Sequence, residues 1–391
     1  MQINLNRNID ISAVNQIPPE EYQDRLQRTR QRMGQEGYDA LILFSDPWRI
    51  SNVCWISNYR SFESIYPNPS LVFLPREGDL TLLVEKTLVE YAKSQTWIKD
   101  VRGARQDFGQ LLKDFAGKAK PEKIGIVGYQ YLDLEFWDTI ASSLPKIKIE
   151  RSTIVDHLKC IKSETEIRLM KMAGLIADQA LADLRENLKE GMTEREAARI
   201  LYGSMFLNGA DSEAFDIFVQ SGAHSELNIY RPQNKPIRKG EVLLVDHGCR
   251  YMNYTSDMGR GVAFGQVTKK QQELLEVTEQ AWLAGVQGLR PGLPASAPVK
   301  YIKAVLEEKG YLLAHNPVGD RFCGHGTGMD PEEEIPVMGS SNTILQENMG
   351  LCYELTLRVP GVGGNRLEDD VIIRKDGPEF LTNFSRLCLW D

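Results

Sequence analysis

The chain has 391 residues, of which 42% are hydrophobic and 26% are charged, and its formal net charge at pH 7 is −8. This composition is typical of a soluble globular protein that is long enough for two hydrophobic cores. The negative net charge argues against binding to nucleic acid or to an anionic membrane. No long apolar run occurs and the first twelve residues are polar, so the sequence predicts a cytoplasmic protein without a membrane span.

The first 150 residues predict an α/β domain. A charged helix is expected at residues 20–36 and a second helix at 133–144, because apolar residues recur there with helical spacing. Apolar strands are expected at residues 38–45, 70–75, 80–85 and 123–128. No G-x-G-x-x-G follows any of these strands, so no dinucleotide site is expected. We place the domain boundary after residue 157, which gives domains of residues 1–157 and 158–391.

The second domain is expected to begin with two helices. A long helix at residues 163–190 is rich in Ala, Leu, Met and Glu. The next helix is expected to start at Thr193, because Glu196 three residues later would complete a capping box. Further helices are expected at residues 269–289 and 297–309, with strands and loops from residue 317 onward.

A hairpin at Val242–Gly265 carries two acidic residues. Asp246 ends the apolar strand VLLVD, and Asp257 follows a turn-forming segment. An antiparallel hairpin can bring both carboxylates to one face. Two buried carboxylates repel each other unless a proton or a cation lies between them, and hard divalent cations prefer oxygen ligands. The alternative is a solvated turn with two ordinary acids.

Three further ionisable residues lie in apolar or glycine-rich segments downstream. His325 lies in FCGHGTGMD, Glu354 in LCYELTLRV and Glu368 in GNRLEDDVII. Burial of such groups is costly unless they are paired or bind a metal. With Asp246 and Asp257 they form a five-residue set that could hold two divalent ions, which can generate a bridging hydroxide and polarise a substrate. The same set suits manganese, iron, cobalt or zinc.

The six cysteines are scattered and form no CxxC pair, which indicates reduced thiols rather than a disulfide framework. Cys249 and Cys323 lie close to the acidic motifs in sequence. We expect neither to be a thiolate ligand, because the other expected donors are mostly hard oxygens.

Five motifs in this order resemble those of metallopeptidase family M24, which includes methionine aminopeptidase, aminopeptidase P, prolidase and creatinase. The motifs are Asp246-His247-Gly248, Ser256-Asp257, Gly324-His325-Gly326-Thr327-Gly328, Glu354, and Arg366-Leu367-Glu368-Asp369-Asp370. The resemblance covers nearly the whole chain. It implies a creatinase-like α/β N-terminal domain and an α+β catalytic domain with the pita-bread fold. It also implies two metal ions, a homodimer, and a small-molecule or short peptide substrate.

The chain departs from the peptidases of this family at two histidine positions. Ile229 lies where the peptidases have a histidine before the first aspartate, and His224 is a candidate replacement. Glu332 lies nearest the position of the second histidine. In the peptidases these histidines hold the substrate and stabilise the tetrahedral intermediate, so their loss removes hydrogen-bond donors from the transition state. The Pro-Gly that follows the fourth ligand in the family is replaced by Leu355-Thr356.

Three functions remain open. The first is a hydrolase acting on an amide, amidine or Xaa-Pro-like bond, with Glu354 or Glu332 as general base and Tyr230, Arg231 or Arg358 holding the substrate. The second is non-peptidase chemistry on a small carboxylate, either a lyase reaction, as in the family's dimethylsulfoniopropionate lyase, or iron- and oxygen-dependent chemistry. The third is a non-catalytic binding scaffold, which the intact five-residue set argues against.

The remaining candidates have weaker support. The resemblance implies that the segment Asn58–Phe62 approaches the partner's site in a homodimer, which would make Arg60 a substrate-binding residue. The side chain of His247 is expected to point away from that of Asp246, because neighbours along a strand face opposite ways. His157 and His315 are expected to have no role. The acidic run at residues 332–334 either is solvated or lines the pocket.

Overall fold

A computed structural model describes residues 3–10, 16–61, 68–103, 107–311, 323–333 and 341–391. Phe62, His315 and Glu334, which the sequence analysis considered, lie outside these ranges. The chain forms two compact units, one of Ile17–Lys159 and the other of Met1–Gln16 with Cys160–Asp391. Each unit is described by itself below.

The N-terminal arm belongs to the second unit, whereas the sequence analysis grouped it with the first. The Asn4 amide donates to Asn187 Oδ1 at 3.0 Å, and Asn6 Nδ2 donates to Asp183 Oδ1 at 2.9 Å. These bonds tie the arm to the first long helix of the second unit.

The unit of residues 17–159 is built on a six-stranded sheet in the order β4-β3-β2-β1-β5-β6. Its strands are β1 (Ala40–Ser45), β2 (Ser70–Pro75), β3 (Thr81–Val84), β4 (Asp100–Gly103), β5 (Lys123–Val127) and β6 (Lys148–Arg151). Its helices are α1 (Pro19–Glu36), α2 (Ser51–Ser57), α3 (Val89–Gln95), α4 (Phe108–Ala119), α5 (Leu134–Ser143) and α6 (Ile154–Lys159). The strand β2 runs antiparallel to β1 and β3, and the other pairings are parallel. The four strands and two helices expected here from the sequence all form.

The second unit is built on a curved sheet whose central strands follow the order β13-β14-β15-β12-β9-β8. Its strands are β7 (Ser212–Glu213), β8 (Phe218–Ser221), β9 (Glu241–His247), β10 (Cys249–Tyr251), β11 (Tyr254–Thr255), β12 (Met258–Phe264), β13 (His325–Gly326), β14 (Gly350–Val359), β15 (Gly363–Arg374), β16 (Gly377–Phe380) and β17 (Cys388–Trp390). Its helices are α7 (Glu164–Asn187), α8 (Glu194–Leu207), α9 (Lys269–Gly285) and α10 (Ala297–Glu308). The central pairings are all antiparallel, so side chains on directly opposite residues share a face.

Capping boxes define where three of these helices begin. The predicted box at Thr193 and Glu196 is confirmed, and equivalent boxes start α7 at Ser163 and α9 at Thr268. Each satisfies two backbone N–H groups that the first helical turn leaves without partners.

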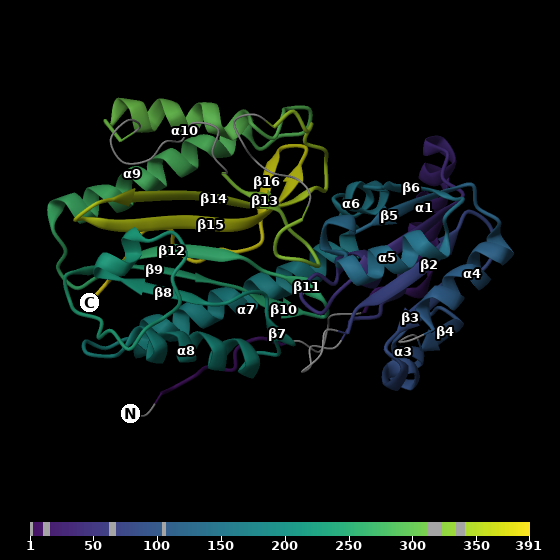
Figure 1. Cartoon of the computed structure of the whole chain (residues 1–391). Coiled ribbons are helices and arrows are strands. Elements are labelled where there is room, and N and C mark those ends of the chain that lie inside the picture. The colour runs from purple at the N-terminus through teal and green to yellow at the C-terminus, as the bar shows by residue number, and fades with distance from the viewer. Residues whose placement is uncertain (1–2, 11–15, 62–67, 104–106, 312–322, 334–340) are drawn as a thin grey trace. The chain divides into compact units, whose positions relative to one another are not determined.

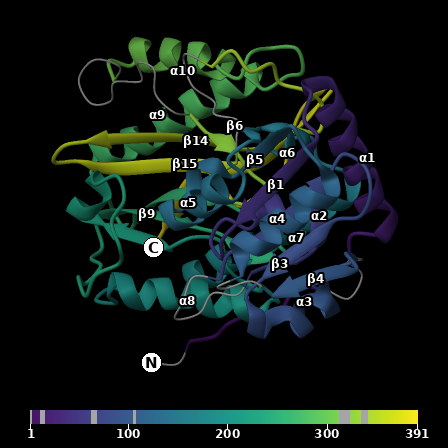
Figure 2. The same cartoon turned by 45° about the vertical axis from the view of Figure 1, so that its right-hand side comes forward.

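Two helix pairs cover the sheet, and α9 lies between α10 and the strands β14 and β15 (Figures 1 and 2). On β14, Tyr353 packs against Trp282 of α9, and the two exchange hydrogen bonds. On β9, the Nε2 of His247 donates to the Ala177 carbonyl of α7 at 3.0 Å. As expected, His247 therefore points away from the face that carries Asp246. Both helix pairs therefore pack against the same face of the curved sheet. We call the opposite face, which carries Asp246 and Glu354, the open face.

The predicted hairpin at residues 242–265 forms, with one addition. The strands β9 and β12 pair in antiparallel register, and the short strands β10 and β11 extend the hairpin beyond them. Met252 and Asn253 make its turn with positive φ angles of 46° and 72°, as tight hairpin turns require.

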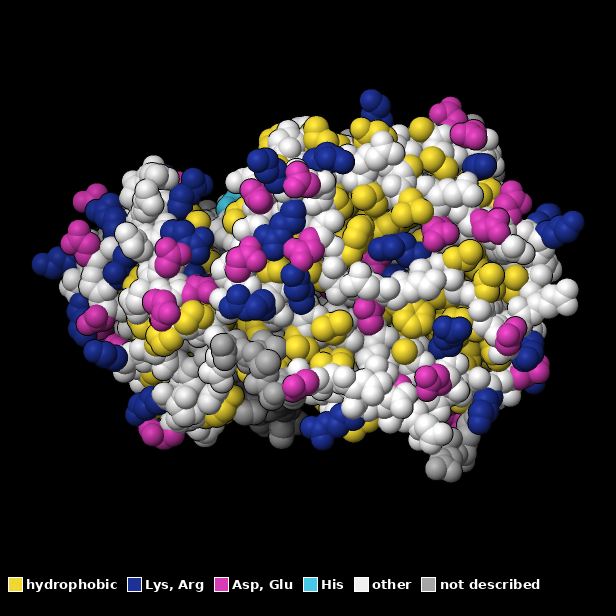
Figure 3. Space-filling model, turned by 180° about the vertical axis from the view of Figure 1, so that it is seen from behind, with side chains coloured by type: hydrophobic (Ala, Val, Ile, Leu, Met, Phe, Trp, Pro, Cys, Tyr) yellow, Lys and Arg dark blue, Asp and Glu magenta, His cyan; other side chains and the backbone are white. Residues whose placement is uncertain are grey.

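The surface agrees with the charge balance of the sequence. On the face in Figure 3, basic and acidic side chains are interspersed rather than gathered in a patch of one sign. Among the described residues, no helix is both long enough and apolar enough to cross a membrane.

Candidate metal centre

One row of directly opposite residues crosses the open face of the sheet. Glu354 on β14 lies opposite Glu368 on β15, and Glu368 lies opposite Gly259 on β12. Gly259 in turn lies opposite Asp246 on β9. Because opposite residues of antiparallel strands share a face, all three carboxylates project from the same side of the sheet.

A buried group of donors lies next to this row. Asp257, His325, Cys352 and Glu368 each offer one ligand atom, and these four atoms lie within 4.8 Å of one another. The Nε2 of His325 is 3.6 Å from Asp257 Oδ2 and 3.9 Å from Glu368 Oε1. The Nδ1 of His325 is 3.1 Å from the Gly326 carbonyl, which can only accept a hydrogen bond. A neutral ring with its proton on Nδ1 would satisfy this contact and turn the Nε2 lone pair toward the carboxylates, as a metal ligand requires.

A partly buried arginine, Arg366, holds Asp246 in place. Arg366 on β15 extends across Gly259, and its Nη1 donates to Asp246 Oδ2. A Cβ on Gly259 would lie 2.8 Å from Arg366 Cγ and 3.0 Å from Glu368 Cβ, so only glycine leaves this path open. The Nε of the same guanidinium group donates to Thr356 Oγ1 at 3.0 Å, so two hydrogen bonds fix its orientation.

The electrostatics of the carboxylates require a cation or protons. Burial raises the pKa of Asp257 well above its usual value, and repulsion from Asp246 and Asp370 raises it further. Burial likewise raises the pKa values of Asp246 and Glu368, although Arg366 opposes both shifts. Asp246 Oδ1 and Glu368 Oε2 are buried and have no hydrogen-bond partner within the described part of the chain. Orphaned carboxylate oxygens around an imidazole nitrogen fit a divalent metal ion.

The second acidic candidate, Glu332, lies apart from this group. It is exposed, whereas the side chain of its neighbour Glu333 is buried and forms an ion pair of 2.6 Å with Lys162. Glu333 Oε1 also accepts the Met329 amide at 3.0 Å. Of the acidic run expected at residues 332–334, Glu333 therefore has a structural role and Glu332 faces solvent.

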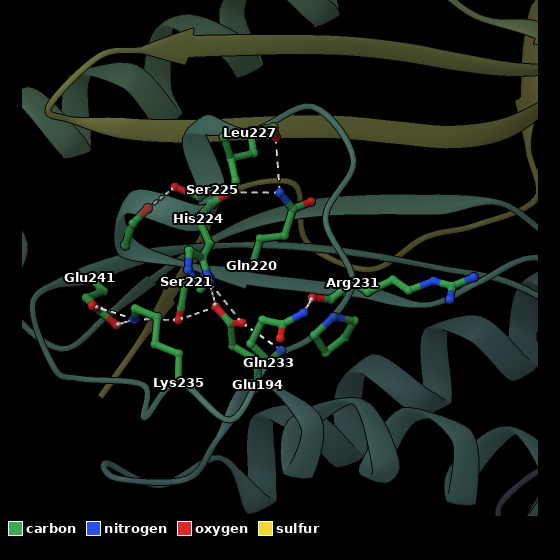
Figure 4. A network of polar contacts seen from close by, with 12 residues as sticks. Glu194, Gln220, Ser221, His224, Ser225, Leu227, Arg231, Gln233, Lys235 and Glu241 are labelled. Carbon is green, nitrogen blue, oxygen red and sulfur yellow. Dashed lines mark hydrogen bonds and ion pairs between the residues drawn. The ribbon is translucent and has the colours of Figure 1, made fainter.

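His224 belongs to a different network (Figure 4). Its Nδ1 lies 3.0 Å from Oε1 of Glu194, which is fully buried and also accepts the Ser221 hydroxyl and the Gln233 amide. Tyr230 packs against the His224 ring with centroids 4.6 Å apart. The strand β8 ends at Ser221, which lies opposite Leu243, and His224 comes three residues later. Asp246 lies opposite Phe218, at the other end of β8. His224 and Tyr230 are thus not brought to the carboxylate row.

The arginine candidates differ in their surroundings. Arg231 is exposed and donates to Asp216 Oδ2 through both Nε and Nη2. Arg358 lies on the same face of β14 as Glu354 and donates to Asn228 Oδ1 at 2.6 Å. Arg60 follows α2 in the other unit, where it is half-buried.

Sequence reasoning missed Cys352. It considered Cys249 and Cys323, which are buried and outside the donor group; burial raises the pKa of each thiol to about 12. Cys352 precedes Glu354 by two residues, so the strand alternation that places Glu354 on the open face places Cys352 there as well. That spacing was the available signal.

Comparisons with known proteins match both parts of the chain. Residues 168–375 match metallopeptidase family M24, and residues 25–161 match the creatinase/prolidase N-terminal domain. The Xaa-Pro dipeptidase of Pyrococcus furiosus is 30% identical over 319 residues, covering 80% of this chain and 87% of that protein. The Xaa-Pro dipeptidase of Pyrococcus horikoshii is 33% identical over 233 residues, and the match spans 60% of this chain and 65% of that protein.

Solved structures agree over nearly the full length. An Xaa-Pro dipeptidase from Bacillus anthracis superposes with a TM-score of 0.83 at 25% identity, covering 94% of this chain and 99% of that chain. The prolidase from Pyrococcus horikoshii OT3 gives a TM-score of 0.83 at 27% identity, covering 93% and 99%. The expected pair of folds, an α/β N-terminal domain and a pita-bread C-terminal domain, is confirmed.

Proposed function

This chain belongs to metallopeptidase family M24, and from that premise we propose that it is a two-metal hydrolase that cleaves a C–N bond of a small substrate. The observation that carries the proposal is the donor group of Asp257, His325 and Glu368, in which Glu368 Oε2 is buried without a hydrogen-bond partner among the described residues. The bond is an amide, an amidine or an Xaa-Pro-like peptide bond. The relatives named as Xaa-Pro dipeptidases support the last of these.

Five residues would hold the ions: Asp246, Asp257, His325, Glu354 and Glu368. When bound, a pair of divalent ions supplies an activated water and polarises the scissile carbonyl. The chain itself contributes the orientation of the donors. Arg366 keeps Asp246 aimed at the open face, and the Gly326 carbonyl fixes the tautomer of His325.

Glu354 is better suited than Glu332 to move a proton. It is half-buried on the open face directly opposite Glu368, whereas Glu332 is exposed. A general base must lie within hydrogen-bond reach of the proton that it takes, and only Glu354 shares the carboxylate row.

Arg358 is better suited than Arg231 to hold a substrate carboxylate. It lies four residues beyond Glu354 on the same strand face, about 13 Å along β14. Arg231 is already paired with Asp216. The Arg358 side chain, extended back along the strand, would hold the substrate carboxylate between its guanidinium group and the metal ions. A guanidinium group can bind a carboxylate through two parallel hydrogen bonds.

A second candidate function rests on the two replaced histidines. Ile229, at the first position, is 64% exposed and offers no hydrogen bond, and Glu332, nearest the second, faces solvent. A site without these donors could instead carry out lyase or iron-dependent oxygen chemistry on a small carboxylate. A non-catalytic scaffold is the third possibility. A homodimer in the cytoplasm remains part of the proposal.

The test begins with metal content. Protein purified without chelator should carry about two divalent ions per chain. Asp257→Asn should lose at least one of them, while Glu213→Gln, an exposed acid-to-amide change on β7, should keep both. Metal-loaded protein should then hydrolyse an Xaa-Pro dipeptide or a small amide without oxygen, and Asp257→Asn should lower the rate at least a hundredfold.

The other outcomes separate the alternatives. Turnover only with iron and oxygen, or elimination without hydrolysis, would favour the second candidate. Absence of bound metal in the unmodified protein would overturn the hydrolase and leave the scaffold.

A further inference from the structure

Cys352 lies between a candidate ligand, His325, and a buried acidic residue, Asp370. It lies directly opposite His325 of β13 on one side and opposite Asp370 of β15 on the other. Antiparallel partners share a face, so the thiol and the imidazole project together. The side chain is fully buried, and Sγ lies 3.2 Å from Glu368 Oε1.

The spacing of these donors matches a metal coordination shell. Bonds of roughly 2.0–2.3 Å from a tetrahedral ion to oxygen, nitrogen and sulfur place the donors about 3.3–3.8 Å from one another. The observed separations are 3.2 Å from Sγ to Glu368 Oε1 and 3.6 Å from His325 Nε2 to Asp257 Oδ2. His325 Nε2 and Glu368 Oε1 are 3.9 Å apart. The other pairs of donor atoms lie within 4.8 Å of one another, so shifts of up to about 1 Å would bring all four donors to these spacings.

A second observation points to a ligand at the same place. Glu368 Oε2 and Asp370 Oδ1 are buried side-chain oxygens with no hydrogen-bond partner in the described ranges. Glu368 is one of the four donors, and Asp370 lies opposite the cysteine. If the thiol served only to donate a hydrogen bond to Glu368, it would leave both of these oxygens unsatisfied.

We propose that the sulfur of Cys352 is a direct ligand of the ion held by Asp257, His325 and Glu368. The inference rests on the proposed metal centre and specifies its chemistry. A metal–sulfur bond forms and the thiol proton is released to solvent. A site with nitrogen, oxygen and sulfur donors favours zinc, cobalt or ferrous iron over manganese, because manganese prefers oxygen ligands.

Cobalt-loaded protein provides the test. Protein stripped with chelator and titrated with Co²⁺ should develop a sulfur-to-cobalt charge-transfer band, and X-ray absorption should detect sulfur at about 2.3 Å. Cys352→Ser should lose both signals. It should also bind Zn²⁺ at least tenfold more weakly while its Mn²⁺ affinity changes less. Cys323→Ser is the matched control, because Cys323 is a buried thiol two residues before His325 but outside the donor group. It should keep both signals.

The opposing outcomes can be told apart. Cobalt bound by the unmodified protein without sulfur scattering would overturn the inference and leave the proposed hydrolase intact. Absence of any bound cobalt would overturn both. If Cys352→Ser fails to fold, X-ray absorption of the unmodified protein still decides whether sulfur is a ligand.

Discussion

Gly259→Ala tests whether the path of Arg366 across β12 holds the metal centre together. The new methyl carbon would lie 2.8 Å from Arg366 Cγ, 3.0 Å from Arg366 Cδ and 3.0 Å from Glu368 Cβ. The arginine must then leave Asp246 or the strands must separate. Extra carbon in a packed interior costs about 1–3 kcal/mol of unfolding free energy. Displacing a residue that orients a ligand lowers metal affinity about 10–100-fold.

The assay is urea unfolding of chelator-treated protein combined with calorimetric titration of Co²⁺. Gly203→Ala is the control, because its Cβ would meet only Leu5 Cδ1, at 3.0 Å, the end of a flexible side chain. This change in α8 should leave metal binding unaltered and stabilise by at most about 1 kcal/mol.

A double variant isolates the cause. Arg366→Ala removes two of the three carbons that the new methyl group would meet and leaves only Glu368 Cβ, so Gly259→Ala should cost less in that background. The expected coupling between the changes is about 0.5–3 kcal/mol. If Gly259→Ala matched the unmodified protein within about 0.5 kcal/mol and bound Co²⁺ equally well, the bridging role assigned to Arg366 would be wrong.

Three further predictions concern the ion pair of Glu333, the buried thiols and Arg60. Glu333→Gln should lower the free energy of unfolding by about 3–5 kcal/mol, because it removes the carboxylate charge that faces the buried ammonium group of Lys162. Glu332→Gln on the exposed neighbour should change the free energy of unfolding by less than about 0.5 kcal/mol, and equal effects of the two changes in urea titrations would contradict the assignment. Cys249 and Cys323 should resist alkylation at pH 8 until the protein unfolds, because burial raises the pKa of each thiol to about 12, and rapid labelling detected by mass spectrometry would refute this. Arg60→Ala should raise KM with little change in melting temperature, and an unaltered KM would end the idea that its segment reaches a partner's site.

The family and the five candidate metal ligands could be predicted from the residue types and their order in the sequence. Each motif consists of residues close in sequence and places one ionisable side chain in an apolar or glycine-rich segment. These side chains are those of Asp246, Asp257, His325, Glu354 and Glu368. Local signals also predicted the helix start at Thr193 and the hairpin of β9 and β12, because capping and turn formation depend on residues close in sequence.

The roles of neighbouring side chains depended on strand pairing between distant segments. Alternation along β14 shows that Cys352 and Glu354 share a face, but only its pairing with β13 brings the thiol beside His325. The reach of Arg366 to Asp246 likewise depends on β12 and its glycine.

The burial and the roles of loop residues depend on interaction partners that sequence patterns do not identify. Glu332 and Glu333 are chemically identical neighbours, yet Lys162, 171 residues from Glu333 in sequence, buries one and leaves the other exposed. His224 was a candidate for the site until the tertiary structure paired it with Glu194. The sequence specifies which chemical groups the chain contains and favours particular local elements. The packing of distant strands and loops determines which of those groups come into contact.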